Sequence, residues 1–192
     1  MNIEIWASGG GTNADTLIRY FKNVADISVV SVGCNRREAG VFQVAKQHAI
    51  PSMYWGKSNW NTKDILAELA ERKVDYIVLA GFLKLVPAEV TQAYNGRIVN
   101  IHPSLLPAYG GKDMYGIHVH NAVLANKEEF TGITIHEVNE EFDKGKVLAQ
   151  YTTKLSPLTE GLDSIKSKIQ TLEHTNFAPV VDAWIRSKTL IP

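Results

Sequence analysis

The sequence predicts an α/β protein in which a mostly parallel, twisted sheet is flanked by helices. Four short apolar segments in the first half alternate with segments of helical periodicity. The fourth, Asp75–Ala80, is almost continuously apolar, as in parallel strands that helices cover on both faces. The second half ends in two β-like segments and a long helical one. We therefore predict a doubly wound sheet that binds ligands at the carboxyl ends of its strands, followed by a β-hairpin and a long helix.

The elements of the first half follow from local patterns. The predicted strands are Asn2–Ala7, Ile27–Val32, Ile50–Tyr54 and Asp75–Ala80. The predicted helices are the segment with Leu17, Ile18 and Phe21 at helical spacing, Glu38–His48, and Thr62–Arg72 with Ile65, Leu66 and Leu69 on one face. The loop Trp55–Trp60, with a turn over Gly56–Asn59, gives no indication of its role.

Composition narrows the class of protein. The chain has 192 residues, enough for one α/β domain over 1–192, and 20 basic residues balance 20 acidic ones. This balance gives no support for broad binding to nucleic acid or membranes. Cys34 is the single cysteine, so no intrachain disulfide can form, which fits a reducing cytoplasm. We see no run of apolar residues typical of a membrane span and no signal peptide at the N-terminus, and we expect a cytoplasmic protein.

The segment Asn100–Pro107 carries the residues best suited to chemistry. Arg97–Val99 is predicted as a buried strand that leads into it, and alternation along an extended chain places Asn100 and His102 on one face. Pro103 should end the strand. An amide can donate to a developing oxyanion and an imidazole can transfer a proton near neutral pH. Taken alone, the same pattern more often forms a capped turn with a hydrogen-bonded histidine.

A glycine-rich turn, Ser8–Asn13, lies between the first predicted strand and helix. This arrangement directs backbone N–H groups and a helix N-terminus at an anion. The turn lacks the spacing of a dinucleotide fingerprint and the Gly-Lys-Ser/Thr of a P-loop. The glycines can equally serve close packing of strand and helix.

The second half supplies a helix and a hairpin. Ala108–Gly116 is glycine-rich and expected to be mobile, and Ile117–Asn126 is a predicted helix. Its His118 and His120 are two positions apart and do not share a helical face, so we predict no metal site. Thr131–Val138 and Val147–Thr153 are predicted to pair around an acidic loop.

The last predicted helix is Thr159–Arg186, which Pro179 should kink or break. Gln170, Glu173 and His174 have the spacing of one helical face, which by itself is typical of a solvated surface. Gly81–Val86, after the fourth strand, is apolar, and Phe82 at least is expected to cover the core.

The string Asn100-Ile-His-Pro-Ser-Leu-Leu-Pro107 resembles the signature loop of the folate-dependent formyltransferases, and Asp143-Lys-Gly145 resembles their Asp-x-Gly turn. The resemblance extends from Met1 to about Arg186. It implies a Rossmann-like formyltransferase fold, catalytic roles for Asn100, His102 and Asp143, and 10-formyltetrahydrofolate as co-substrate without a metal. A carboxylate beside His102 is expected to raise the imidazole pKa and to orient the ring.

Within this family the glycine-rich turn resembles the one that holds the phosphate of glycinamide ribonucleotide. The resemblance implies substrate binding by Gly11, Thr12, Asn13, Gln170 and Glu173. It implies folate binding by Leu83, Lys84, Leu85, Val86, Asn100, Asn139, Glu140, Glu141 and Phe142. It also places His120 near the active site. Lys84 and Lys168 stand where the family often has arginine, and lysine lacks the bidentate fork of that side chain.

The expected function is transfer of a formyl group to the amine of glycinamide ribonucleotide in purine synthesis, by a monomer or homodimer. Formyltetrahydrofolate hydrolysis and formylation of another amine remain alternatives. Relatives with those activities carry a further domain before or after the catalytic one, and we expect no such domain here. A non-catalytic nucleotide-binding module is a third alternative, against which the intact Asn100, His102 and Asp143 argue.

Overall fold

The structure is a computed structural model that describes residues 1–58 and 60–189. The chain folds as two compact units, of which the first is Met1–Asn100 and the second begins at Ile101. Each unit is presented by itself, and the expectation of a single domain stays a prediction. Asn59, part of the loop whose role the sequence leaves open, lies outside the described residues.

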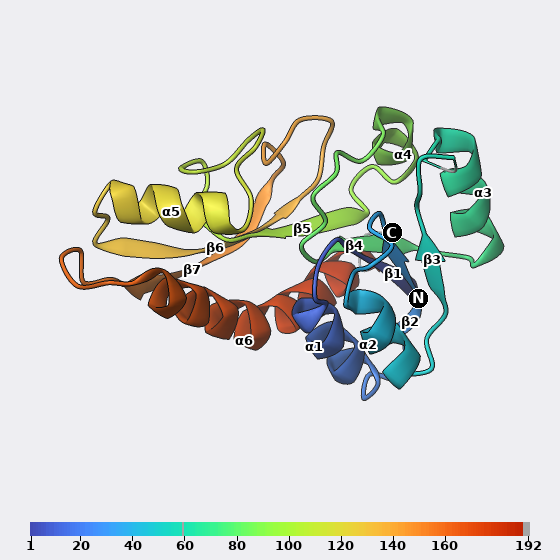
Figure 1. Cartoon of the computed structure of the whole chain (residues 1–192). Helices are drawn as coiled ribbons and strands as arrows, with labels where there is room; N and C mark the ends of the chain where they lie inside the picture. The colour runs from blue at the N-terminus through green and yellow to red at the C-terminus, as the bar shows by residue number, and fades with distance from the viewer. Residues whose placement is uncertain (59, 190–192) are drawn as a thin grey trace. The chain divides into compact units, whose positions relative to one another are not determined.

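The first unit contains a parallel sheet with the strand order β3-β2-β1-β4-β5 (Figure 1). Its strands are β1 (Asn2–Ala7), β2 (Ser28–Cys34), β3 (Ser52–Tyr54), β4 (Tyr76–Leu79) and the first part of β5 (Ile98–His102). In the two central strands, Ile3, Ile5, Ile77 and Val78 are fully buried. This order is that of a doubly wound fold, so the predicted fold class is confirmed.

The helices of the first unit are α1 (Thr12–Phe21), α2 (Val41–Gln47), α3 (Thr62–Glu71) and α4 (Ala88–Ala93). Figure 1 shows α1 and α2 on one face of the sheet and α3 and α4 on the other. The predicted start of α2 at Glu38 is wrong, because residues 38–40 form a turn that ends in Gly40. The sequence analysis missed α4, a short helix that begins after Pro87.

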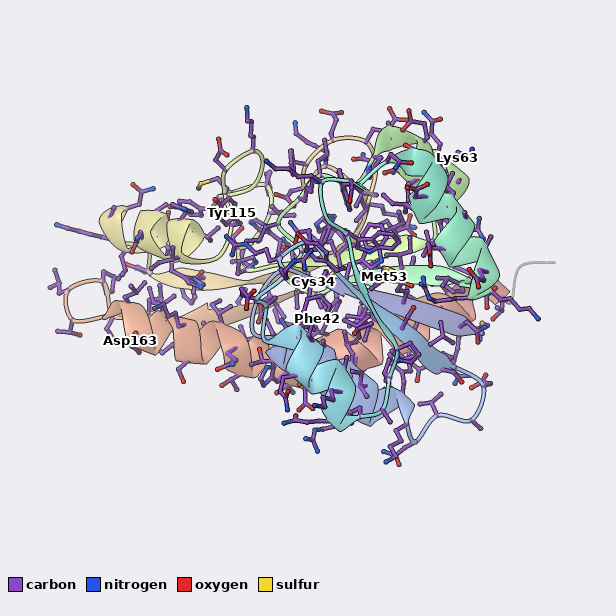
Figure 2. The ribbon with its side chains drawn as sticks, turned by 45° about the vertical axis from the view of Figure 1, so that its right-hand side comes forward. Cys34, Phe42, Met53, Lys63, Tyr115 and Asp163 are labelled. Atoms are coloured by element: carbon purple, nitrogen blue, oxygen red, sulfur yellow. The ribbon has the colours of Figure 1, made fainter. Side chains whose placement is uncertain are left out.

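β2 ends later than predicted, at Cys34 rather than Val32, because its last residues still pair with β3. Gly33 is paired with Met53, and Cys34 with Tyr54. Cys34 and Met53 mark these two neighbouring strands in Figure 2. Gly33 also allows close packing, since a Cβ there would lie 2.4 Å from Nε1 of Trp55.

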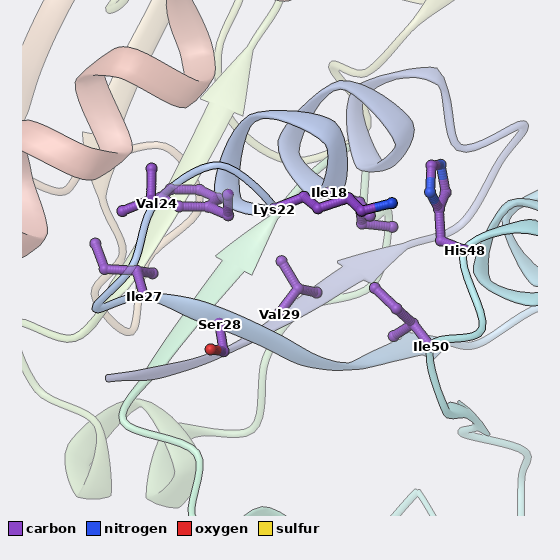
Figure 3. Close-up of a pocket in the computed structure, with 9 residues that line it drawn as sticks. Ile18, Lys22, Val24, Ile27, Ser28, Val29, His48 and Ile50 are labelled. Carbon is purple, nitrogen blue, oxygen red and sulfur yellow. The ribbon is translucent and has the colours of Figure 1, made fainter.

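A cavity of about 280 Å³ lies between α1 and β2 (Figure 3). Ile18 and Lys22 of α1, Val29 of β2, and His48 and Ile50 beyond α2 are among its lining residues. None of the predicted site residues lines it. The cavity therefore plays no part in the site described below.

The second unit contains the end of β5 followed by β6 (Phe130–Glu137) and β7 (Val147–Lys154), which pair antiparallel as predicted. Its helices are α5 (Ile117–Ala125) and α6 (Leu162–Thr189). Figure 1 shows α6 running along the hairpin of β6 and β7, and α6 also contacts α5. Tyr115, just before α5, and Asp163, in the first turn of α6, are labelled in Figure 2.

Pro179 does not break α6, which is continuous from Leu162 to Thr189. A proline within a helix costs about 3 kcal/mol, because it lacks an N–H and crowds the preceding turn. Phe177 and Val181, on either side, are buried. Burial of such side chains is worth about 1.5–3 kcal/mol each, which is enough to offset the proline.

Candidate active site

The end of β5 places the two residues on which the site depends. β5 includes both Asn100 and His102, and their alternate positions place them on one side of the strand, as predicted. Asn100 is half-buried and His102 is only 4% exposed. The strand ends at His102 because Pro103 cannot continue the hydrogen-bond ladder.

The chain after β5 is held in place by one hydroxyl group of β6. Oγ1 of Thr134 donates to the carbonyl of Ser104 (2.7 Å) and accepts the N–H of Leu106 (2.9 Å). Gln150, the residue opposite Thr134 on β7, donates from Nε2 to both Thr134 Oγ1 and the Leu106 carbonyl, at 2.9 Å each. The hairpin therefore fixes the backbone that follows His102.

Tyr109 defines the tautomer of His102. Its carbonyl lies 2.8 Å from Nε2 of His102, and a carbonyl can only accept, so Nε2 carries a proton. The phenol of Tyr109 donates to Glu128 (2.6 Å) and accepts from Asn126 (2.7 Å). This end of the 108–116 loop is thus anchored, although the sequence predicts the loop as mobile.

Asp143 lies between two histidines. Its Oδ2 is 3.5 Å from Nδ1 of His102 and accepts the N–H of Gly111 at 2.9 Å, while its Oδ1 is 3.5 Å from Nε2 of His136. Asp143 has a φ of 55°, a conformation that aspartate tolerates better than most residues. The structure therefore brings together two of the predicted catalytic residues, His102 and Asp143, in one buried cluster.

The pKa values in this cluster are set by burial and by the neighbouring charges. Burial lowers the pKa of His102 below its ordinary value, and the charge of Asp143 and the Tyr109 carbonyl oppose this only in part. The expected effect of the carboxylate is confirmed, since Asp143 acts to raise the pKa of His102, but burial has the larger effect and the net shift is downward. Burial alone would raise the pKa of Asp143, but His136, His102 and the Gly111 N–H together lower it.

His136 is a member of the cluster that the sequence analysis missed. It is 2% exposed, and its Nδ1 donates to the carbonyl of Glu137 at 2.8 Å, which directs Nε2 to Asp143. A β-bulge between Ile135 and His136 changes the register there. A histidine within a predicted strand, followed a few residues later by Asp143, could have indicated that His136 belongs to the site. The approach of its side chain to Asp143 was not visible in the sequence.

Gly145 explains the tight turn that carries Asp143. A Cβ at this position would lie 1.6 Å from the Glu137 carbonyl oxygen, so only glycine fits. The loop before it, residues 139–142, is exposed, and Phe142 is 38% exposed. Oδ1 of Asn139 accepts the N–H of Glu141 at 3.0 Å. The folate contacts predicted for this loop stay predictions.

In the first unit, the glycine-rich turn leads directly into α1. Gly11 is the N-cap residue, with φ 85°, and a Cβ there would lie 2.8 Å from the Cα of Val41. Gly11 is therefore needed for packing as well as for its position at the helix N-terminus. Gly9 and Gly10, in contrast, are exposed, and a Cβ on either would meet nothing within 4 Å. The backbone of these two residues is the part of the turn that a ligand can approach.

The 81–86 loop of the first unit divides into core and surface positions. Phe82 is buried against Trp6, with ring centroids 5.2 Å apart, as expected, and Val86 is also buried. Leu83 and Leu85 are 38% and 44% exposed and offer an apolar surface. Such a surface suits an aromatic ligand ring, and the folate contacts predicted for Leu83, Lys84, Leu85 and Val86 stay predictions.

The two tryptophans whose roles the sequence leaves open have different environments. Trp55 is fully buried, with its ring centroid 6.0 Å from that of Trp6. Trp60 is half-buried, and the ammonium of Lys84 lies 4.0 Å from its ring centroid. Burial lowers the pKa of Lys84. The lysine that replaces the family arginine thus makes a cation–π contact.

On α6, Gln170 is exposed and Glu173 half-buried, and their predicted contacts with the substrate stay predictions. Lys168 instead serves the structure: its ammonium bonds to Glu160 (2.8 Å) and to the Lys154 carbonyl (3.0 Å). This contact, with bonds from Ser164 and the Ser156 N–H, lowers the pKa of Glu160 to about 2. Lys168 therefore stabilises the segment that connects β7 to α6.

The histidines of α5 have different environments, as their spacing predicts. His118 is exposed and contacts the ring of Tyr115, while His120 is buried. Burial, and next the charge of Lys166, lowers the pKa of His120. Among the described residues, no group of three or more His, Cys, Asp and Glu side chains is placed to hold a metal ion. No helix within residues 1–58 and 60–189 has the length and hydropathy to span a membrane.

Comparison with known proteins gives a consistent result. The family model described as formyl transferase matches residues 1–181. Phosphoribosylglycinamide formyltransferase of Bacillus subtilis is 32% identical over 183 residues, which cover 92% of this chain and 91% of the relative. The chloroplastic enzyme of the same name from Arabidopsis thaliana is 38% identical over 191 residues, covering 94% of this chain. The chain spans only 64% of that protein and 60% of the Vigna unguiculata relative.

The solved structures agree with the sequence matches. The crystal structure of phosphoribosylglycinamide formyltransferase from Bacillus halodurans has a TM-score of 0.87 and 32% sequence identity. The match covers 99% of this chain and 98% of that one. The enzyme of the same name from Brucella melitensis has a TM-score of 0.84 and 30% identity, covering 95% and 94%.

Proposed function

Because this chain belongs to the formyl transferase family, we propose that it transfers the formyl group of 10-formyltetrahydrofolate to the primary amine of glycinamide ribonucleotide. The observation that carries the proposal is the 3.5 Å approach of Asp143 Oδ2 to Nδ1 of His102, at the end of the strand that also carries Asn100. An amide donor, an imidazole and a carboxylate are the groups that acyl transfer to an amine requires.

In the proposed reaction the amine attacks the formyl carbon and forms a new C–N bond. The electrons of the C=O double bond move to oxygen, and Asn100 donates an amide N–H to that oxyanion. One such donor is worth about 3 kcal/mol of barrier. The intermediate then collapses, the bond from the formyl carbon to the folate nitrogen breaks, and that nitrogen takes up a proton. The products are the formylated amide and tetrahydrofolate.

His102 is the proposed carrier of that proton. Its Nε2–H is engaged with the Tyr109 carbonyl, and the lowered pKa keeps the ring neutral near pH 7. Nδ1 therefore holds a lone pair that can accept the proton lost by the attacking amine. Asp143 stabilises the imidazolium formed, and the ring then gives the proton to the leaving nitrogen.

The binding roles in this proposal are those that the resemblance to the family implies, and the exposure of several of these residues supports them. The open backbone at Gly9 and Gly10, with Gly11, Thr12 and Asn13 at the N-terminus of α1, suits the ribonucleotide phosphate. Gln170 and Glu173 contact the rest of that substrate. Leu83 and Leu85, with Lys84, Val86, Asn100 and residues 139–142, bind the folate. We further propose that the reaction takes place in the cytoplasm, which the single cysteine supports.

The test is turnover of 10-formyltetrahydrofolate with and without glycinamide ribonucleotide. The proposal expects little consumption in water alone, rapid consumption once the amine is present, and a formylated ribonucleotide as product. Equal rates with and without the amine would indicate hydrolysis instead. Rapid turnover with another amine, and none with glycinamide ribonucleotide, would also overturn the proposal.

A further inference from the structure

We propose that Ser8 is a positioning residue that couples the glycine-rich turn to the 81–86 loop, so that binding of the ribonucleotide and of the folate strengthen one another. This inference rests on the proposed function, which assigns the two ligands to these two segments. It concerns the first unit alone.

Ser8 belongs to the turn by sequence and to the loop by its hydrogen bonds. Its backbone N–H donates to the Gly81 carbonyl at 3.0 Å. Its Oγ accepts the N–H of Leu83 at 2.9 Å. Ser8 therefore holds the loop at its first residue and again two residues later, while Gly9 and Gly10 follow it directly in the turn.

The hydroxyl of Ser8 has no freedom to compensate for movement. It is 1% exposed, and its own proton is donated to Oδ1 of Asn35 at 2.6 Å. With Leu83 on one side and Asn35 on the other, a shift of the turn must move Leu83 or break a buried hydrogen bond, which is unfavourable. A ligand that orders the turn thus also orders the loop.

A second contact of the loop does not involve Ser8. Lys84 lies over the ring of Trp60, and that ring packs on Phe82 with centroids 5.7 Å apart. This contact should support folate binding directly without linking it to the turn. A variant at Ser8 should therefore remove the coupling, whereas a variant at Lys84 should weaken only the binding of the folate.

The experiment is calorimetric titration with glycinamide ribonucleotide and with tetrahydrofolate, which has no formyl group to transfer. Each ligand is titrated into free protein and into protein saturated with the other. In the wild-type protein we expect each to lower the Kd of the other by the same factor, about fivefold or more, because coupling is reciprocal. In Ser8→Ala the factor should fall to about one.

Three variants complete the design. Asn35→Ala removes the acceptor that orients the hydroxyl and should reduce the factor while Ser8 is intact, so it replaces Ser8→Ala if that protein does not fold. Lys84→Met should raise the Kd for tetrahydrofolate and leave the factor unchanged. Ser28→Ala, at an exposed serine, should change neither quantity.

The outcomes separate the inference from the proposed function. Wild-type protein that binds neither ligand contradicts the proposed function, and the inference is wrong with it. Wild-type protein that binds both ligands independently, or a Ser8→Ala protein that keeps the full factor, overturns the coupling through Ser8 and leaves the proposed function standing. A loss of the factor in Lys84→Met equal to that in Ser8→Ala would also overturn it.

Discussion

Nδ1 of His102, at the end of β5, lies 3.5 Å from Oδ2 of Asp143, which a turn after β6 presents. Because Nε2 of His102 donates to the Tyr109 carbonyl, Nδ1 is the atom that gains and loses a proton. Asp143 also faces His136 and the N–H of Gly111, so its carboxylate is fixed from three directions. The charge of Asp143 and the protonation of His102 are therefore linked, and the first prediction tests this link.

Asp143→Asn should move the acidic limb of the kcat/KM profile to lower pH. The neutral ring is the proposed base, so activity is lost as pH falls through the pKa of His102. That pKa is already lowered by burial, and the Asp143 charge opposes the lowering. Removing the charge must lower it further. The rate above this limb should also fall, because the imidazolium loses its stabilising partner. The measurement is kcat/KM from about pH 5 to 9.

Asp163→Asn is the control for this prediction, because its carboxylate is 99% exposed and its profile should match the wild type. In the double variant His102→Ala/Asp143→Asn, the rate should be little lower than in the worse single variant, since residues that act as a unit are not additive. Fully additive losses, or an unmoved acidic limb, would show that Asp143 does not act through His102.

Asn100→Ala should lower kcat about a hundredfold or more, with a modest change in KM. The amide is proposed to donate to an oxyanion that exists only in the transition state. Steady-state kinetics with both substrates measures the effect, and Asn95→Ala, at an exposed position, is the matched control. A raised KM with unchanged kcat would assign Asn100 to ground-state binding instead.

Two neighbouring glycines should respond differently to alanine. Gly10→Ala should fold with wild-type stability and raise the KM for glycinamide ribonucleotide, because its Cβ meets open space where the phosphate is proposed to approach. Gly11→Ala should lower the free energy of unfolding by about 1–3 kcal/mol, because of its positive φ and the contact with Val41. Urea unfolding measures the free energy of unfolding of each variant, and steady-state kinetics measures its KM for each of the two substrates. An unchanged KM for glycinamide ribonucleotide in Gly10→Ala would show that the phosphate does not bind at this turn.

Thr134→Val should both destabilise the protein and lower kcat. The methyl group cannot accept the Leu106 N–H or donate to the Ser104 carbonyl, and such an unmade buried bond costs about 1–3 kcal/mol. Thr134→Ser keeps the hydroxyl and should retain most of the activity. Urea unfolding and kcat are measured for both variants. Equal losses of kcat in the two would mean that the hydroxyl does not position the segment after His102.

The alternating elements and the hairpin could be recognised from local patterns in the sequence, since apolar periodicity follows directly from which face is buried, and Pro103 marks the end of β5. Asn100, His102 and Asp143 were singled out by their resemblance to the formyltransferase motifs, and their catalytic roles stay predictions. The boundaries were less well determined. The start of α2 depends on a turn ending in Gly40, and α4 is too short to show a periodic pattern.

Only the tertiary structure decided how the residues of the candidate site are arranged. Nε2 of His136 lies 3.5 Å from Oδ1 of Asp143, and Gly11 is constrained by Val41, which follows it far along the chain. The direction of the pKa shift at His102 depends on the balance of burial against one carboxylate, and burial is a sum over neighbours from several segments. Sequence determines which groups are present and how the local chain folds. The distances and the exclusion of water that give those groups their chemistry arise only when distant segments pack together.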